Sequence, residues 1–274
     1  MEKLCYNKNK TKGGFKMNKY KILICGYGNI GKHIEKEFQH PNIEIDIFDS
    51  YKQEYNTIKD AIFYDFIFIC VPTEKNLNGS VNILEVTNSI NKFQKRGTTI
   101  VIKSTIPVRT AKRVCHHNIV FSPEFYGTTQ HSFEQPDFLI VAGNKKHCDR
   151  LIELYKTVKN AEFRFILTDP ATAALAKYMD NCWIASKVTF CNEFATIADG
   201  FNVDYNELRE CFLADRRVNP SHTFVYKDEP YFNSHCLNKD VPGLIYQCEK
   251  EKIKTPLMKK ILKIRNKRSK KKNG

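Results

Sequence analysis

Three glycines with the spacing Gly26-x-Gly28-x-x-Gly31 indicate a phosphate-binding turn, because they lie between an apolar run and a segment with a helical pattern. Glycine at these points permits a tight turn, lets the backbone approach a pyrophosphate, and allows close packing of helix on strand. The N-terminus of the following helix offers unpaired N–H groups to the phosphates. The sequence therefore predicts a dinucleotide site formed by Gly26, Tyr27, Gly28, Asn29, Ile30 and Gly31.

Asp49 indicates which dinucleotide would bind, since it follows the next apolar alternating run, residues 43–48. A carboxylate there can accept both ribose hydroxyls of NAD and repels the extra phosphate of NADP. We therefore expect NAD as the cofactor. Lys52 is a nearby cation, so tolerance of NADP stays open, as does a glycine turn that has lost its nucleotide.

A second group of residues could carry out covalent chemistry. Cys236 lies in the segment Cys-Leu-Asn-Lys-Asp, and a thiolate beside the cation Lys239 is a strong nucleophile. Lys177 and Asn181 stand four residues apart in a helical pattern, so they can present two donors to one tetrahedral oxyanion. The plainer interpretations are that Cys236 is one more buried cysteine among ten and that Lys177 is a solvated charge.

Alternating strands and helices are expected to position the dinucleotide site. Apolar β runs occupy residues 21–25, 43–48, 65–71, 98–104, 118–122 and 137–143, and helical segments fit between several of them. This alternation predicts an α/β fold with a Rossmann-type, doubly wound parallel sheet that is covered on both faces.

The character of the sequence changes after Thr168-Asp169-Pro170. Residues 171–199 contain no Gly or Pro, which predicts one long helix capped at Gly200 and, because such a helix needs a partner, a homodimer through it. A shorter helix around 204–214 and a loop that carries Cys236 should follow. The expected domains are a flexible extension (1–17), an NAD-binding Rossmann domain (18–169), a helical dimerisation and catalytic domain (170–265) and a basic tail (266–274).

Composition argues against several classes of protein. The chain has 274 residues, enough for one large domain or two modest ones, and no apolar run approaches the ~18 residues of a membrane-spanning helix. The net charge of +14 is concentrated at the ends, since residues 252–274 carry 11 Lys or Arg and no acid, so no specific nucleic-acid groove is implied. Ten cysteines without a CxxC pair or a secretory signal favour reduced thiols in the cytoplasm, and no metal site is expected.

Six segments carry a further signal: GYGNIG (26–31), CVPTEKN (70–76), KSTIPVRT (103–110), SPEF (122–125), LAKYMDNCWIASKVTFCNEF (175–194) and HCLNKD (235–240). In this order they resemble the UDP-glucose/GDP-mannose dehydrogenase family, over about residues 20–265. The resemblance implies an NAD-dependent enzyme that oxidises the C6 hydroxyl of a nucleotide sugar through a cysteine thiohemiacetal and thioester. The default reaction is UDP-glucose to UDP-glucuronate, for polysaccharide biosynthesis.

The resemblance also implies roles for individual residues. Cys236 would be the nucleophile that adds to the aldehyde, and Asp240 would orient a water or tune the cysteine. Lys177 and Asn181 would hold the oxyanion or a water, and Thr105 would lie at the nicotinamide near the reacting carbon. The remaining positions would contact the cofactor (Val71, Pro72, Thr73, Lys239) or the sugar (Glu124, Phe125, Asn233).

The sequence departs from the family pattern at three places. Thr128 stands where the family carries a Glu that is the base in thioester hydrolysis, and losing such a base slows a step by about 10²–10⁴-fold. The glycine-rich loop before the cysteine is here FNSH (232–235), so the pocket should be narrower. The chain stops in a segment that resembles the family's linking helix, so contacts to the base of the nucleotide should be missing unless another chain supplies them. Leu257, Ile261 and Leu262 should be exposed.

Three alternatives stay open at this stage. The same fold could stop after one oxidation, because Thr128 cannot act as a base. A degenerate NAD-binding dimerisation module would bind without turnover and use its basic tail for a partner. A single-step dehydrogenase of the 6-phosphogluconate or hydroxyacid type shares the Rossmann and helical domains but does not need the segment HCLNKD.

Overall fold

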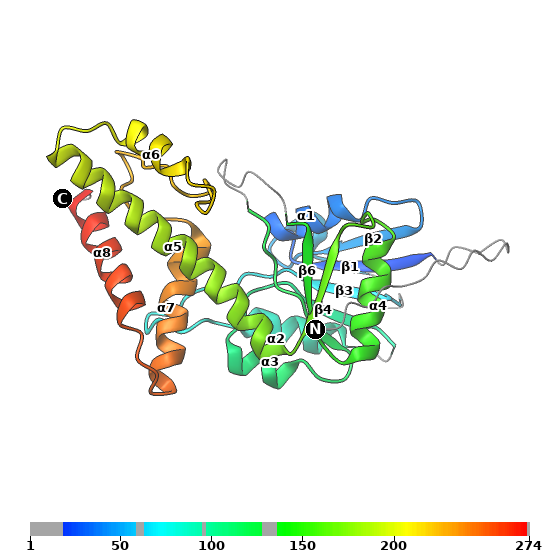
Figure 1. Cartoon of the computed structure of the whole chain (residues 1–274). Helices are drawn as coiled ribbons and strands as arrows, with labels where there is room; N and C mark the ends of the chain where they lie inside the picture. Colours follow the sequence, from blue (N-terminus) through cyan, green and yellow to red (C-terminus); the bar gives the residue numbers. More distant parts are fainter. Residues whose placement is uncertain (1–18, 59–62, 95–96, 128–135, 273–274) are drawn as a thin grey trace.

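Seven strands form one sheet in the computed structural model, which describes residues 19–58, 63–94, 97–127 and 136–272 (Figure 1). The strand order is β2-β1-β3-β4-β5-β6-β7, and the Rossmann-type α/β prediction is confirmed. The strands are β1 (Tyr20–Cys25), β2 (Ile43–Phe48), β3 (Phe66–Ile69), β4 (Thr99–Ile102), β5 (Ile119–Phe121), β6 (Phe138–Gly143) and β7 (Arg164–Thr168).

The sheet differs from the prediction at one side. β6 pairs antiparallel with β5, so the sheet is mixed rather than wholly parallel, and β7 extends it by pairing parallel with β6. β7 was not predicted. It pairs with β6 at the end of the sheet, and Ile166 and Leu167 stay 42% and 51% exposed, so its sequence lacks the pattern of a buried strand.

β3 illustrates how the sequence builds two cores. Phe66 and Phe68 pack into one core and Ile67 and Ile69 into the other, because successive side chains of a strand point to opposite faces. On the first face the sheet is covered by α1 (Asn29–Glu37) and α4 (Lys145–Lys156). On the second face it is covered by α2 (Leu84–Phe93) and α3 (Val108–Val114).

The long helix predicted at 171–199 is present as α5 (Pro170–Gly200). Asp169 caps it by accepting backbone N–H groups of the first turn, and Pro170 opens it. Ala173 and Ala174 belong to the core beneath the sheet, so α5 starts inside the Rossmann domain. The predicted cap at Gly200 is wrong, because Gly200 is still helical and the left-handed residue beyond it is Asn202, with φ of 56°.

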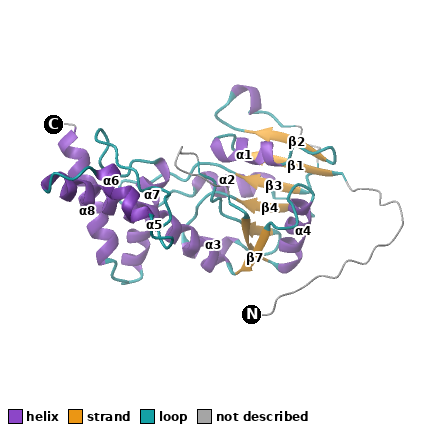
Figure 2. Cartoon of the chain, turned by 45° about the horizontal axis from the view of Figure 1, so that its top comes forward, coloured by secondary structure: helices purple, strands orange, loops and turns teal. Residues whose placement is uncertain are grey.

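Three further helices gather along α5, beside the sheet (Figure 2): α6 (Tyr205–Leu213), α7 (His235–Lys250) and α8 (Pro256–Lys272). The prediction that Cys236 lies in a loop is wrong, since it lies in the first turn of α7 behind the capping residue Ser234. Ile261 is buried and Leu262 partly buried against α5 and α7, so the predicted exposure holds only for Leu257.

The structure describes the expected C-terminal tail in part but not the expected N-terminal extension. The expected extension, residues 1–17, lies outside the described residues. α8 continues unbroken past the expected start of the basic tail at 266. Arg268 in this segment donates to the Asn192 carbonyl of α5 at 3.2 Å, so part of the basic segment is bound to the helical domain. None of the helices in the described ranges has the length and apolar character that a membrane span requires.

Candidate functional site

In the glycine turn between β1 and α1, two glycines are required by the packing of the protein, and the third leaves space for a ligand. Gly26 has φ of 93°, and a Cβ on it would lie 2.8 Å from the backbone of Val71. A Cβ on Gly31 would lie 2.2 Å from the Gly26 carbonyl oxygen. A Cβ on Gly28 would meet no atom within 4 Å, and no side chain caps α1. The protein itself therefore leaves room above the uncapped helix N-terminus, which fits a dinucleotide pyrophosphate.

Asp49 lies beside this turn, as the sequence predicted. Its Oδ2 accepts the backbone N–H of Tyr27 at 2.8 Å and its Oδ1 accepts that of Tyr51 at 2.9 Å. The carboxylate is thus held next to the glycine turn, where a ribose would follow the pyrophosphate. Lys52 donates to the Tyr27 carbonyl at 2.6 Å and is engaged by the turn itself. The Tyr27 hydroxyl bonds to Glu35, which raises the pKa of Tyr27 to about 12.

The segments after β3 and β4 lie against the glycine turn at the carboxyl edge of the sheet. Ser104 Oγ donates to the Val71 carbonyl at 2.6 Å and so joins the two segments. Thr73 is buried and Thr105 partly buried there. The structure therefore brings the predicted cofactor residues of these segments to the same edge as residues 26–31: Val71, Pro72, Thr73 and Thr105.

An ion pair that the sequence analysis did not single out lies under this edge. Lys103, fully buried at the end of β4, lies 3.1 Å from Glu124. Glu124 also accepts the N–H groups of Phe125 and Tyr126 at 2.9 and 3.0 Å. Burial raises the pKa of Glu124, but Lys103, His33 and these donors outweigh burial, so the pKa lies below its usual range. Glu124 is therefore held ionised.

Replacing Glu124 with glutamine is expected to lower the free energy of unfolding at pH 7 by about 1–3 kcal/mol, since Lys103 would lose its ionic partner. Because folding lowers the pKa of Glu124, its ionised carboxylate contributes to the free energy of unfolding at pH values above its ordinary pKa of 4.5. This contribution is lost as the pH falls through the lowered pKa of the folded state. The unfolding energies of the wild type and Glu124→Gln should thus converge below pH 4.5. Urea unfolding at several pH values measures this, and a constant difference would contradict it.

The helical domain contributes a second buried cluster, centred on Asp240 of α7. Asp240 is fully buried, and it accepts hydrogen bonds from Asn181 Nδ2 at 2.5 Å and Lys239 Nζ at 2.6 Å. Lys177, one turn before Asn181 on α5, lies 3.2 Å from Asp180 and 4.6 Å above the ring of Phe125. Lys177 thus reaches the SPEF segment of the Rossmann domain, whereas the Lys239 ammonium is bound to Asp240 within α7.

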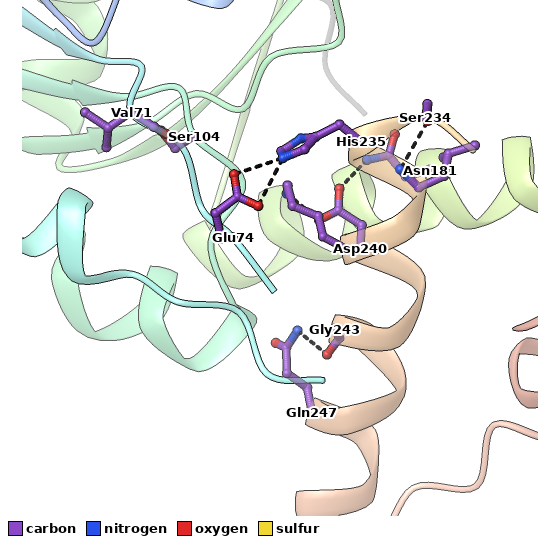
Figure 3. A network of polar contacts seen from close by, with 11 residues as sticks. Val71, Glu74, Ser104, Asn181, Ser234, His235, Asp240, Gly243 and Gln247 are labelled. Atoms are coloured by element: carbon purple, nitrogen blue, oxygen red, sulfur yellow. Dashed lines mark hydrogen bonds and ion pairs between the residues drawn. The ribbon is translucent and has the colours of Figure 1, made fainter. Parts of the chain in front are cut away.

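Cys236 is exposed in the first turn of α7, and His235 of this turn contacts Glu74 in the loop after β3. Figure 3 shows His235 and Glu74 pointing toward one another across the boundary between the domains, near Asn181 and Asp240. His235 Nε2 lies 3.0 Å from Glu74 Oε1. The helix turn that carries the nucleophile candidate therefore lies next to the loop after β3.

Asn233, a predicted sugar contact, is bonded to its own loop and to the helices α7 and α8. Its side chain donates to Glu229 at 2.6 Å and accepts from Asn238 and Arg265, each at 3.0 Å. This set of bonds gives Asn233 a role in shaping the loop before Cys236. Thr128, the position of the missing family Glu, lies outside the described residues.

Comparison with known proteins places these observations in a family. The model of the UDP-glucose/GDP-mannose dehydrogenase family NAD-binding domain matches residues 34–159, and the model of its central domain matches residues 171–267. UDP-glucose 6-dehydrogenase of Rickettsia prowazekii is 27% identical over 214 residues, which are 73% of this chain and 49% of that protein. The chain spans about half the length of the curated UDP-glucose 6-dehydrogenases that it matches.

Solved structures share the fold. A UDP-glucose dehydrogenase from Pyrobaculum islandicum matches with a TM-score of 0.76 at 19% identity, over 93% of this chain and 70% of that chain. A UDP-D-ManNAc dehydrogenase from Pyrococcus horikoshii matches with a TM-score of 0.74 at 20% identity, over 90% and 68%. Both domain models match in chain order, and the glycine turn fits a dinucleotide, so NAD is the cofactor. The chain belongs to the UDP-glucose/GDP-mannose dehydrogenase family.

Proposed function

We propose that this protein oxidises the C6 hydroxyl of a nucleotide sugar to a carboxylate with NAD, and that UDP-glucose is its substrate. The observation that carries the proposal is the position of Cys236. The sulfur stands in a helix turn that the Glu74–His235 contact ties to the loop after β3, directly behind the predicted cofactor residue Thr73. A covalent nucleophile beside a hydride acceptor is the arrangement that a two-step oxidation of an alcohol needs.

Five of the predicted residues have a place in this scheme: Cys236, Lys177, Asn181, Asp240 and Glu124. NAD, when bound, supplies the hydride acceptor. Lys177, near the SPEF segment, and Asn181 are donors for the oxygen that becomes negative when the Cys236 sulfur adds to the aldehyde carbon. Asp240 fixes the amide of Asn181, and Glu124 stands ionised on the sugar side. Loss of hydride from the thiohemiacetal gives a thioester on Cys236, which water then hydrolyses.

The stoichiometry of NADH formation tests the proposal. Purified protein is incubated with limiting UDP-glucose, and NADH and sugar acid are counted, with UDP-N-acetylsugars and GDP-mannose in parallel. Two NADH and one acid per UDP-glucose are expected. One NADH per sugar without acid would indicate a single-step dehydrogenase. No NADH with any of these sugars, despite measurable NAD binding, would indicate a module without turnover.

We further propose a homodimer through α5. Large apolar side chains recur along α5 and its C-cap at intervals of three, four or seven residues and are 39–77% exposed, although Phe190 also contacts Phe212 of α6. They form an exposed stripe: Leu175, Met179, Trp183, Phe190, Phe194, Ile197 and Phe201. Exposed apolar patches of this extent mark interaction surfaces. A second copy supplies an identical stripe, which a two-fold axis can bring against the first.

Charged substitutions within the stripe are expected to prevent dimerisation. Trp183→Lys combined with Phe190→Lys should shift the mass by light scattering from twice the chain mass to the chain mass. Leu84→Lys is the matched control, because Leu84 is 57% exposed on α2, outside the stripe. A wild-type protein that is monomeric at micromolar concentration would contradict the proposal.

A further inference from the structure

Glu74 and His235 form a carboxylate–imidazole pair at the boundary of the two domains. His235 Nε2 lies 3.0 Å from Glu74 Oε1 and 3.1 Å from Oε2. Glu74 directly follows the cofactor residue Thr73, and His235 directly precedes Cys236. The side chains of the pair are 61% and 62% exposed, so water reaches both of them. The pair thus stands next to the sulfur on which the thioester would form.

The hydrogen bond determines which nitrogen of His235 is free. A carboxylate only accepts hydrogen bonds, so in the neutral ring Nε2 carries the proton and Nδ1 is an acceptor. No hydrogen bond from the part of the chain that the structure describes reaches Nδ1. A carboxylate in this position fixes the tautomer of the imidazole and stabilises the ring after it takes up a proton, which is the arrangement of a general base.

The other carboxylates near the site are already committed. Asp240 is fully buried and accepts from Asn181 and Lys239. Glu124 is neutralised by Lys103, and its pKa lies below its usual range, which makes it a weak base. His235 is therefore the candidate base beside Cys236, because its contact with Glu74 uses Nε2 and leaves Nδ1 for a water. His235 directly precedes Cys236 in the first turn of α7, so the ring belongs to the same helix turn as an acyl group on Cys236.

We propose that His235, oriented by Glu74, activates the water that hydrolyses the thioester, in place of the family Glu at the position of Thr128. The water oxygen bonds to the thioester carbonyl carbon while Nδ1 of His235 takes one water proton. The carbon–sulfur bond then breaks, the sulfur leaves as a thiolate and receives that proton from the ring, and the sugar acid releases its own proton to solvent. Glu74 is a positioning residue, since it acts through the ring. This inference rests on the proposed function.

The test compares the wild type, His235→Gln and Glu74→Gln with NAD and UDP-glucose. The burst of NADH per active site, the steady-state rate of acid formation and the mass of the intact protein are measured. His235→Gln should keep a burst of two NADH per site, accumulate the acyl adduct on Cys236 and lose about 10²–10⁴-fold in steady-state rate. Hydroxylamine, which cleaves thioesters without a protein base, should release the adduct.

Glu74→Gln should accumulate the same acyl adduct with a smaller loss in the steady-state rate of acid formation. Its NADH burst should stay unchanged, which would distinguish a positioning role of Glu74 from a general structural defect. His116→Gln is the matched control, because His116 is exposed after α3, away from the site, and it should behave as the wild type. Wild-type turnover by His235→Gln, loss of its burst, or an adduct that already accumulates in the wild type would each overturn the role of His235. The absence of NADH in the wild type would overturn the proposed function itself, and so the two failures are distinguishable.

Discussion

Cys236→Ala is expected to lower the rate of sugar-acid formation by at least ~10⁴-fold while the protein stays folded and binds NAD. Without the sulfur no thiohemiacetal forms, so the second hydride has no covalently held donor. The side chain is exposed in the first turn of α7, so its truncation leaves no cavity. Acid formation from UDP-glucose and NAD, measured by chromatography, reports the effect directly.

The matched control for this variant is Cys211→Ala. Cys211 is also exposed and also helical, on α6, but it lies outside the site. Thermal unfolding should give similar midpoints for both variants and the wild type. Sugar-acid formation by Cys236→Ala at the rate of Cys211→Ala would disprove the assignment of the nucleophile.

Gly28→Ala and Gly31→Ala are both expected to weaken NAD binding, but only Gly31→Ala should also destabilise the fold. A methyl group on Gly28 meets no protein atom within 4 Å, so the stability of the protein should stay near that of the wild type. The same methyl group would stand between the backbone and the pyrophosphate, weakening NAD binding by about 1–3 kcal/mol, or roughly 5- to 150-fold in Kd. A methyl group on Gly31 would lie 2.2 Å from the Gly26 carbonyl oxygen, so this variant should be destabilised by about 3 kcal/mol and also bind NAD poorly.

Two measurements separate the glycine variants. Urea unfolding without NAD reports the packing defect, and titration calorimetry with NAD reports the ligand defect. The expected pattern is normal unfolding with weak binding for Gly28→Ala, and early unfolding for Gly31→Ala. Wild-type affinity in Gly28→Ala would show that the pyrophosphate does not pass over this position.

Much of the fold could be predicted because its signals are local. Buried strands such as β3 are short apolar runs, and α5 is a long segment without Gly or Pro. The antiparallel pairing of β5 and β6 has no local signal, since it depends on how the chain returns to the sheet. The prediction places Cys236 in one loop with Pro220 and Pro230, but both prolines precede α7, and Pro242 lies within it.

The part of the site that has a local sequence signal could also be predicted. Residues 26–31 carry a spacing with a physical meaning of its own, so their place at the sheet edge followed from the sequence. The pairs Lys103–Glu124 and Glu74–His235 join residues from different segments, and a single sequence gives no sign of such pairing. Lys103 directly follows an otherwise apolar strand, and a lysine in that position indicates a buried charge that needs an acidic partner.

The course of α5 restricts how a substrate can enter. Its first turns are anchored by Ala173 and Ala174 beneath the sheet, and the helix continues for 31 residues, about 45 Å, into the other domain. Swinging the domains apart at their junction would require tearing these alanines from the core or bending a continuous helix. If the proposed function holds, we therefore expect a sugar nucleotide to enter by local displacement of the loop after β3 and the first turn of α7, and breaking the Glu74–His235 contact is one such movement.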